Sequence, residues 1–196
     1  TRYIAVTGVQ TCALPISLDL FMSSNYKKYS NKEHPIEILY PPEWKAIENF
    51  AGTLVTFLSP YENKKDKFRE MIDIITVEFL HPALDILAEF SQRSVKELRK
   101  SVTAFKLVKN LSEATLAGFP AKEVEYHHRE QDLNLKSYAI WTVVKYQAYI
   151  IATTAVRKKF KEYKPIFDKM IESFKIDKDA LESLSEKVQR KTQSKD

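Results

Sequence analysis

The pattern of apolar and polar positions divides the chain into short strand-like segments and two helix-like segments. Strands are predicted where β-prone runs end at proline, glycine or charged turns. These runs cover residues 36–40, 53–58, 71–80, 105–108, 113–116, 121–129, 133–146 and 149–155. Pro41, Pro42 and Pro60 close the first two runs, because proline has no N–H to donate to a β-ladder.

Two segments have the apolar spacing of amphipathic helices. After Pro82, apolar residues recur three, four and seven to eight positions apart, at Leu84, Leu87, Val95, Leu98 and Val102. A second stripe near the C-terminal end consists of Tyr163, Phe167, Met170, Ile171 and Phe174. The sequence therefore predicts one helix after the third strand and another after the last strand.

The late strands indicate how these elements are layered. Consecutive strands joined by short turns, such as the turn around Gly118, favour antiparallel pairing. Residues 138–144 and 149–155 are apolar at both odd and even positions, unlike a strand with one wet face. We therefore predict an α+β fold in which a central antiparallel β-sheet is flanked by helices on both faces, an α/β/α sandwich. Trp44 and Phe174 are expected in the core, on opposite covers of the sheet.

The first 16 residues do not share this patterning. Val6–Ile16 resembles a common short-read sequencing adapter translated in one frame. We interpret residues 1–16 as an adapter-derived artefact and 17–25 as a truncated N-terminal linker, and expect deletion of 1–16 to leave the melting temperature unchanged. Apolar content falls sharply at the other end, so 177–196 is predicted to be a mobile tail. The remaining residues, 26–176, are predicted to form a single domain.

Composition mainly excludes classes of function. Cys12 is the only cysteine and lies within residues 1–16, so the predicted domain has no thiol for disulfides, thiolate catalysis or zinc. The formal net charge is +5 at pH 7. Spread over a whole domain, this charge is far from the concentrated basic stripe of a nucleic-acid binder, and we expect no nucleic acid as partner. No apolar run approaches the ~20 residues that span a bilayer.

No catalytic or cofactor-binding motif stands out. The chain has no Gly-x-Ser-x-Gly elbow and too few glycines for a phosphate-binding loop. His127 and His128 are adjacent on a predicted strand, so they point to opposite faces and cannot share one metal ion without distortion. Glu123 and Glu125 share a face with His127, but a solvated strand face is favoured over a metal-binding row. We therefore predict no enzyme activity, no cofactor and no metal.

The densest charge cluster lies between the last strand and the last helix. Its members are Arg157, Lys158, Lys159 and Lys161. The simpler interpretation is that these side chains are solvent-exposed residues before the helix. The more specific one is a docking site for an acidic protein partner or anionic lipid headgroups. We take these four residues as the candidate partner-binding site. Their replacement by Gln should abolish binding and change stability by no more than about 0.5 kcal/mol per site.

Several strand ends and turns, in their order along the chain, resemble the PsbP-like family. The residues that carry this resemblance are Ile38 with Tyr40-Pro41 and Trp44, Val55-Thr56-Phe57 with Ser59-Pro60, Leu116 with Gly118 and Pro120-Ala121, Tyr149-Ile150-Ile151 with Thr153, and Ser173-Phe174-Lys175-Ile176. The family's fold was first associated with an extrinsic subunit of the photosystem II oxygen-evolving complex. The resemblance implies the same sandwich here, but it carries over no functional residue.

The resemblance also guides the expectation about function. It implies a non-catalytic, extracytoplasmic domain, exported or membrane-anchored through an N-terminus that is missing here. Such a domain would bind a partner protein or a membrane-associated assembly. Two alternatives stay open: a cytoplasmic adaptor, by analogy with the eukaryotic Ran-binding transport factor that shares the fold, and a small-ligand carrier that uses a cleft between sheet and helix.

Overall fold

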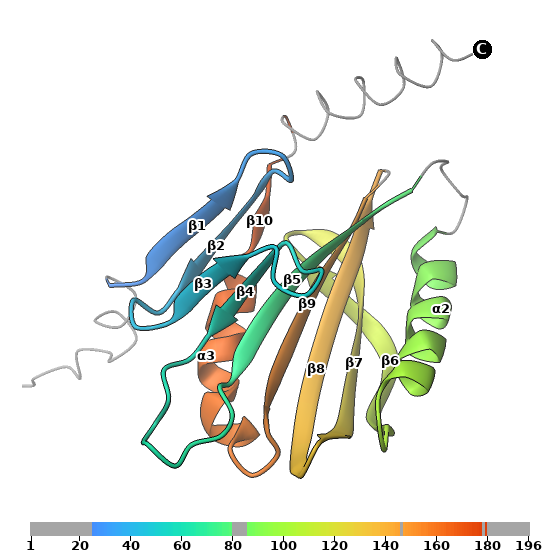
Figure 1. Cartoon of the computed structure of the whole chain (residues 1–196). Coiled ribbons are helices and arrows are strands. Elements are labelled where there is room, and N and C mark those ends of the chain that lie inside the picture. The colour runs from blue at the N-terminus through green and yellow to red at the C-terminus, as the bar shows by residue number, and fades with distance from the viewer. Residues whose placement is uncertain (1–24, 80–85, 146, 178, 180–196) are drawn as a thin grey trace, which may run out of the picture.

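A computed structural model describes residues 25–79, 86–145, 147–177 and 179, which form two antiparallel sheets and two helices (Figure 1). The smaller sheet has the order β1 (Lys27–Asn31), β2 (Ile36–Tyr40) and β10 (Lys175–Ile176). The larger sheet has the order β3 (Lys45–Glu48), β4 (Val55–Leu58), β5 (Met71–Glu78), β9 (Gln147–Val156), β8 (Leu133–Val144), β7 (Phe119–Glu130) and β6 (Lys106–Leu116). The helices are α2 (Ile86–Ser101) and α3 (Phe160–Glu172).

The two faces of the large sheet are covered by different helices, which confirms the predicted α+β sandwich. On β8 and β9, Ile140 and Ile151 belong to the buried cluster that includes α3 residues such as Phe167. Their chain neighbours point the other way, because successive side chains of a strand alternate between faces. Trp141 thus lies in a second cluster, with Phe90 of α2. In each of β8 and β9, apolar residues at odd positions and those at even positions therefore pack on opposite faces of the sheet, and each face is covered by a helix.

Trp44 and Phe174 are both buried, but the prediction that they lie on opposite covers of the sheet is wrong. They are only 4% and 2% exposed and belong to the same cluster. The Trp44 ring lies 6.2 Å from the ring of Phe167, and the Phe174 ring lies 6.4 Å from that of Tyr149. The reason is that α3 packs against both β2 and β9, so the two sheets share one core on its side.

Three short strands were not predicted: β10, a two-residue strand that pairs with β2, and the strands β1 and β3. β1 is mostly exposed and pairs only with β2, and β3 pairs only with β4. Both therefore lie at the edges of their sheets, as Figure 1 shows. An edge strand needs a hydrogen-bonding partner more than an apolar run, so periodicity does not reveal it.

Residues 106–116 form one long strand, where two strands, 105–108 and 113–116, were predicted. β6 pairs with β7 along its length, but the register shifts between Leu107 and Lys109 and again between Lys109 and Ser112. These irregularities fall where the apolar pattern breaks. At the other end of β6, Ala117 and Gly118 form the predicted tight turn, with φ values of +52° and +80°. Positive φ at both positions is what a two-residue hairpin turn requires.

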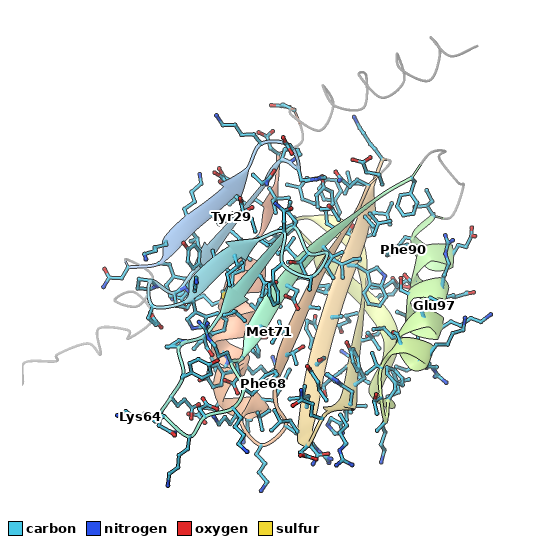
Figure 2. All side chains as sticks on the ribbon, in the orientation of Figure 1. Tyr29, Lys64, Phe68, Met71, Phe90 and Glu97 are labelled. Carbon is cyan, nitrogen blue, oxygen red and sulfur yellow. The ribbon has the colours of Figure 1, made fainter. Side chains whose placement is uncertain are left out.

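Helix α2 lies against the large sheet through its apolar stripe. Leu87, Val95 and Leu98 are partly buried there, and Phe90, which the predicted stripe omitted, points toward the sheet (Figure 2). The predicted helix start at Pro82 and Leu84 lies outside the described residues, as do residues 1–24 and most of 177–196. Neither described helix is long and apolar enough to cross a membrane.

Candidate functional site

The connection between β9 and α3 positions the predicted partner-binding residues. The Arg157 N–H donates to the Asn134 carbonyl at 2.9 Å, and the Lys159 N–H donates to the Val156 carbonyl at 2.8 Å. Phe160, the first residue of α3, is buried in the core. The backbone of the turn is therefore fixed to β8 and to the core, at the lower end of the molecule in Figure 1.

The structure divides the four predicted residues into two groups. Arg157, Lys158 and Lys161 are exposed. Lys159 is half-buried, and its ammonium turns toward the loop between β4 and β5, 2.8 Å from Glu62 Oε2 and 3.8 Å from Asp66 Oδ2. Lys159 thus joins two segments of the chain, and the exposed part of the predicted site consists of the other three residues. Their role in partner binding stays a prediction.

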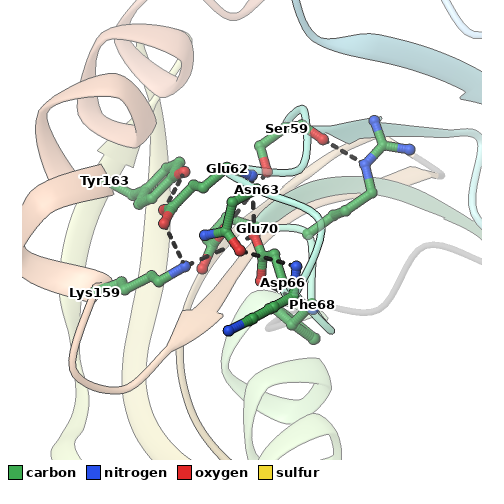
Figure 3. A network of polar contacts seen from close by, with 10 residues as sticks. Ser59, Glu62, Asn63, Asp66, Phe68, Glu70, Lys159 and Tyr163 are labelled. Atoms are coloured by element: carbon green, nitrogen blue, oxygen red, sulfur yellow. Dashed lines mark hydrogen bonds and ion pairs between the residues drawn. The ribbon is translucent and has the colours of Figure 1, made fainter.

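Figure 3 shows the polar network around Lys159, hereafter the Lys159 cluster, formed by Lys159, Glu62, Asp66, Glu70 and Tyr163. The Tyr163 hydroxyl donates to Glu62 Oε1 at 3.0 Å, so Glu62 contacts the helix as well as the turn. Glu70 is fully buried, and its Oε1 has no hydrogen-bond partner within the described part of the chain. The cluster fixes the loop of residues 59–70 against the start of α3.

The electrostatics of the Lys159 cluster follow from its burial and its opposite charges. The hydrogen bond to Glu62 raises the pKa of Lys159, aided by the negative charges of Glu70 and Asp66 and opposed by desolvation. Burial alone would raise the pKa of Asp66, but backbone N–H donors and the Lys159 charge lower it overall. Burial raises the pKa of Glu70, with partial compensation from backbone N–H groups and Lys159. Lys159 therefore compensates part of the negative charge of the loop inside the cluster.

Sequence reasoning missed three further basic residues of this end, Lys64, Lys65 and Lys67. All three are exposed on the loop of residues 59–70, and Figure 2 shows Lys64 at its outer end. What places these lysines beside the turn after β9 is the pairing of Glu62 and Asp66 with Lys159, a contact distant in sequence.

Several clefts lie between the large sheet and α3, and the one beside Tyr138 and Phe167, of the kind considered for a small-ligand carrier, is small. Its volume is about 190 Å³. It is lined by Lys109, Glu123, Glu125, Tyr138, Thr153, Phe160, Lys164, Phe167 and Asp168. Its charged groups pair with neighbouring side chains: Glu123 with Lys109, Glu125 with Lys136 and Asp168 with Lys164. The cleft therefore offers no uncompensated charge to orient a ligand.

The two histidines of β7 lie in different surroundings. His128 Nε2 is 2.9 Å from Ser137 Oγ, and its ring lies 5.5 Å from that of Tyr126, which belongs to the α2 side. Desolvation and the positive charges of Arg157, Lys136 and Lys106 lower the pKa of His127. Within the described residues, no three His, Cys, Asp or Glu side chains are placed to hold a metal ion.

Comparison with known proteins identifies relatives of the whole folded region. Residues 24–176 match the PsbP family. A solution structure of cyanobacterial PsbP from Synechocystis is similar at a TM-score of 0.55 and 19% identity, covering 78% of this chain and 93% of that one. The LpqN protein of Mycobacterium tuberculosis, described as involved in cell envelope biogenesis, has a TM-score of 0.61 and 14% identity, with 81% and 96% coverage. The sequence matches no curated protein.

Proposed function

The chain belongs to the PsbP family, and on that premise we propose that it is a non-catalytic, extracytoplasmic domain that docks on a partner protein or a membrane-associated assembly. The docking surface is the exposed part of the turn after β9 and of the first turn of α3, formed by Arg157, Lys158 and Lys161. The likeness to a protein of mycobacterial cell envelope biogenesis supports an extracytoplasmic setting. Because that likeness is one of fold, the surface itself carries the proposal.

The observation that carries it is the way charge is distributed around the turn. Lys159 pairs with Glu62 and Asp66 in a partly buried contact, so its charge is engaged within the fold. The three remaining basic side chains stand on a turn whose backbone is bonded to β8. A charged surface that is already rigid loses less conformational entropy on binding than a flexible one. Exposed charges of this kind bind oppositely charged partners with a strong dependence on salt.

The test replaces Arg157, Lys158 and Lys161 with Gln and leaves Lys159 in place, since loss of Lys159 would also disturb the fold. Binding in a pull-down from native extract and to anionic vesicles should be lost. Stability should stay within about 0.5 kcal/mol per site, as expected of surface positions. The matched control replaces Arg93, Lys96 and Lys100 on the exposed side of α2, which removes the same charge elsewhere.

The two variants separate a specific surface from general electrostatic attraction. The α2 control should retain most of the binding of the parent protein. Equal recovery of the parent and the turn variant in both assays would refute the proposal. Equal losses in the turn variant and the α2 control would show that net charge, rather than this surface, governs association.

A further inference from the structure

We propose that the loop of residues 60–67 and the turn 157–161 form one surface that binds anionic phospholipid headgroups, with Tyr61 entering the interface. This inference rests on the proposed function and deepens it, because it names the partner of the basic turn as a lipid surface. It also assigns part of the binding to a loop that the sequence had left without a role.

The first step is that the loop and the turn form one structural unit. Glu62 accepts hydrogen bonds from both Lys159 in the turn and Tyr163 in α3, at 2.8 and 3.0 Å. Asp66 accepts backbone N–H bonds from Glu62 and Phe68, at 3.1 and 3.3 Å, which gives the loop its own internal structure. Phe68 is also buried. The polar contacts therefore hold the loop beside the turn, and the buried Phe68 ring anchors the loop in the protein.

The second step is the sign of the outward charge. The acidic groups of the loop face the Lys159 cluster, whereas Lys64, Lys65 and Lys67 are exposed. With Arg157, Lys158 and Lys161 they give six exposed basic side chains. Two acidic residues, Glu62 and Glu162, are also exposed there, and the Glu62 carboxylate pairs with Lys159. The unit thus presents a clear excess of positive charge.

The third step is an exposed aromatic side chain in the same loop. Tyr61 is 61% exposed, the largest value among the exposed large apolar and aromatic residues described. The Arg69 guanidinium lies 5.3 Å from the centre of its ring and donates hydrogen bonds to the carbonyls of Ser59 and Leu58. Arg69 therefore connects the Tyr61 ring to the backbone at the end of β4. A tyrosine has an apolar ring and a polar tip, which suits the headgroup level of a bilayer.

These features together favour a lipid surface over an acidic protein. Lysine ammonium groups are compact point charges without the fixed fork that arginine offers to a single carboxylate or phosphate. Several such charges on a loop that also carries an exposed aromatic fit a layer of many mobile phosphates better than one shaped site. The loop also protrudes from the body of the molecule in Figure 1, where a flat surface can reach it.

The experiment measures partition of the full chain onto vesicles of phosphatidylcholine with 30 mol% phosphatidylglycerol, against pure phosphatidylcholine, over a range of salt. One variant carries Lys64→Gln, Lys65→Gln and Lys67→Gln, and a second carries Tyr61→Ala. The α2 triple variant described above is the charge-matched control. Circular dichroism and thermal melts establish that each variant is folded.

The parent protein should bind the anionic vesicles and not the neutral ones. Each exposed lysine near an anionic surface contributes roughly fivefold to partition, so the loop variant should lose at least tenfold and show a shallower dependence on salt. Tyr61→Ala should lose severalfold with its salt dependence unchanged, because it removes apolar contact and no charge. The α2 control should change by less than about threefold, since its charges are distant from the surface.

Two results would overturn the inference. One is equal loss in the loop variant and the α2 control. The other is an absence of anionic-vesicle binding in the folded parent protein. If the parent fails to bind vesicles but captures an acidic protein through the turn residues, the lipid inference is wrong while the proposed docking function stands.

Discussion

The two faces of the large sheet are covered in very different ways. On the α3 side, one continuous core joins β2, β4, β5, β8, β9 and the helix, and Phe167, Met170 and Phe174 are almost fully buried in it. On the α2 side, the buried cluster is smaller, and Phe90 is the helix residue that reaches it most deeply. Helix α3 is therefore part of the main core, whereas α2 packs on the sheet through a smaller buried cluster.

The polar attachments of the helices differ in the same direction. Helix α3 follows β9 after a short turn and is tied to the loop of residues 59–70 by the Lys159 cluster. Helix α2 is tied to the sheet by one buried side-chain bond, in which Trp141 Nε1 donates to Ser91 Oγ at 2.7 Å. The comparison teaches that equal apolar periodicity in two helices does not imply equal contributions to stability. A helix between two sheets buries more of its surface than a helix on one face.

The largest expected effect tests the main core on the α3 side. Trp44→Ala and Phe174→Ala should each cost ~3–5 kcal/mol, because a large buried ring is lost and a cavity remains. Urea denaturation monitored by circular dichroism measures the change. Midpoints indistinguishable from the parent protein would show that this core is less continuous than the burial of these rings implies. Exposed Phe50→Ala is the matched aromatic control and should change little.

A smaller effect tests the attachment of α2. Ser91→Ala should destabilise the fold by about 1–3 kcal/mol, because the buried Trp141 N–H loses its acceptor. Ser101→Ala is a close control. Ser91 and Ser101 both donate to the carbonyl four residues earlier, at Leu87 and Glu97, but Ser101 is exposed, and the Trp141 N–H donates to Ser91. Equal costs for the two substitutions, measured by urea midpoint, would mean that the bond to Trp141 contributes nothing.

The smallest effect concerns the buried carboxyl on the α3 side. The pKa of Glu70 is raised by burial, so the folded protein binds its proton more tightly than the unfolded chain. By linkage, this group lowers stability as the pH rises through its unfolded and then its folded pKa. Glu70→Gln should therefore stabilise the protein at pH 7, by about 1 kcal/mol. The gain should shrink as the pH falls below the carboxyl range.

Urea midpoints at pH 7 and pH 4 measure this difference. Glu62→Gln is the control and has the opposite expected sign at pH 7, since it weakens contacts to Lys159 and Tyr163. A Glu70→Gln protein that is less stable than the parent at pH 7 would show that the buried carboxylate is stabilised by the cluster rather than tolerated by it.

Much of the architecture was predictable because local patterns and burial agree there. Apolar residues at both odd and even positions of β8 and β9 predicted a helix on each face of the sheet, and the two buried clusters confirm it. Gly118 marked a hairpin that needs positive φ. The edge strands β1 and β3 escaped prediction because their hydrogen-bonding partners, rather than their own apolar residues, hold them in place.

The candidate site was only partly predictable. A run of basic residues marked the turn after β9, but nothing in that run distinguished Lys159 from its neighbours. Its inward direction depends on Glu62 and Asp66, which lie in a loop far earlier in the chain. The lysines of that loop had no visible connection to the turn for the same reason.

The sequence by itself determined most of the elements, the antiparallel pairing of the late strands and the presence of helices on both faces, since these depend on periodicity and turn residues within short windows. The tertiary structure alone decided that Trp44 and Phe174 share one core, that Lys159 is an internal tie, and that two basic segments form one surface. These outcomes depend on contacts between residues distant in the chain. Such contacts form only when burial and charge pairing act on the whole fold at once.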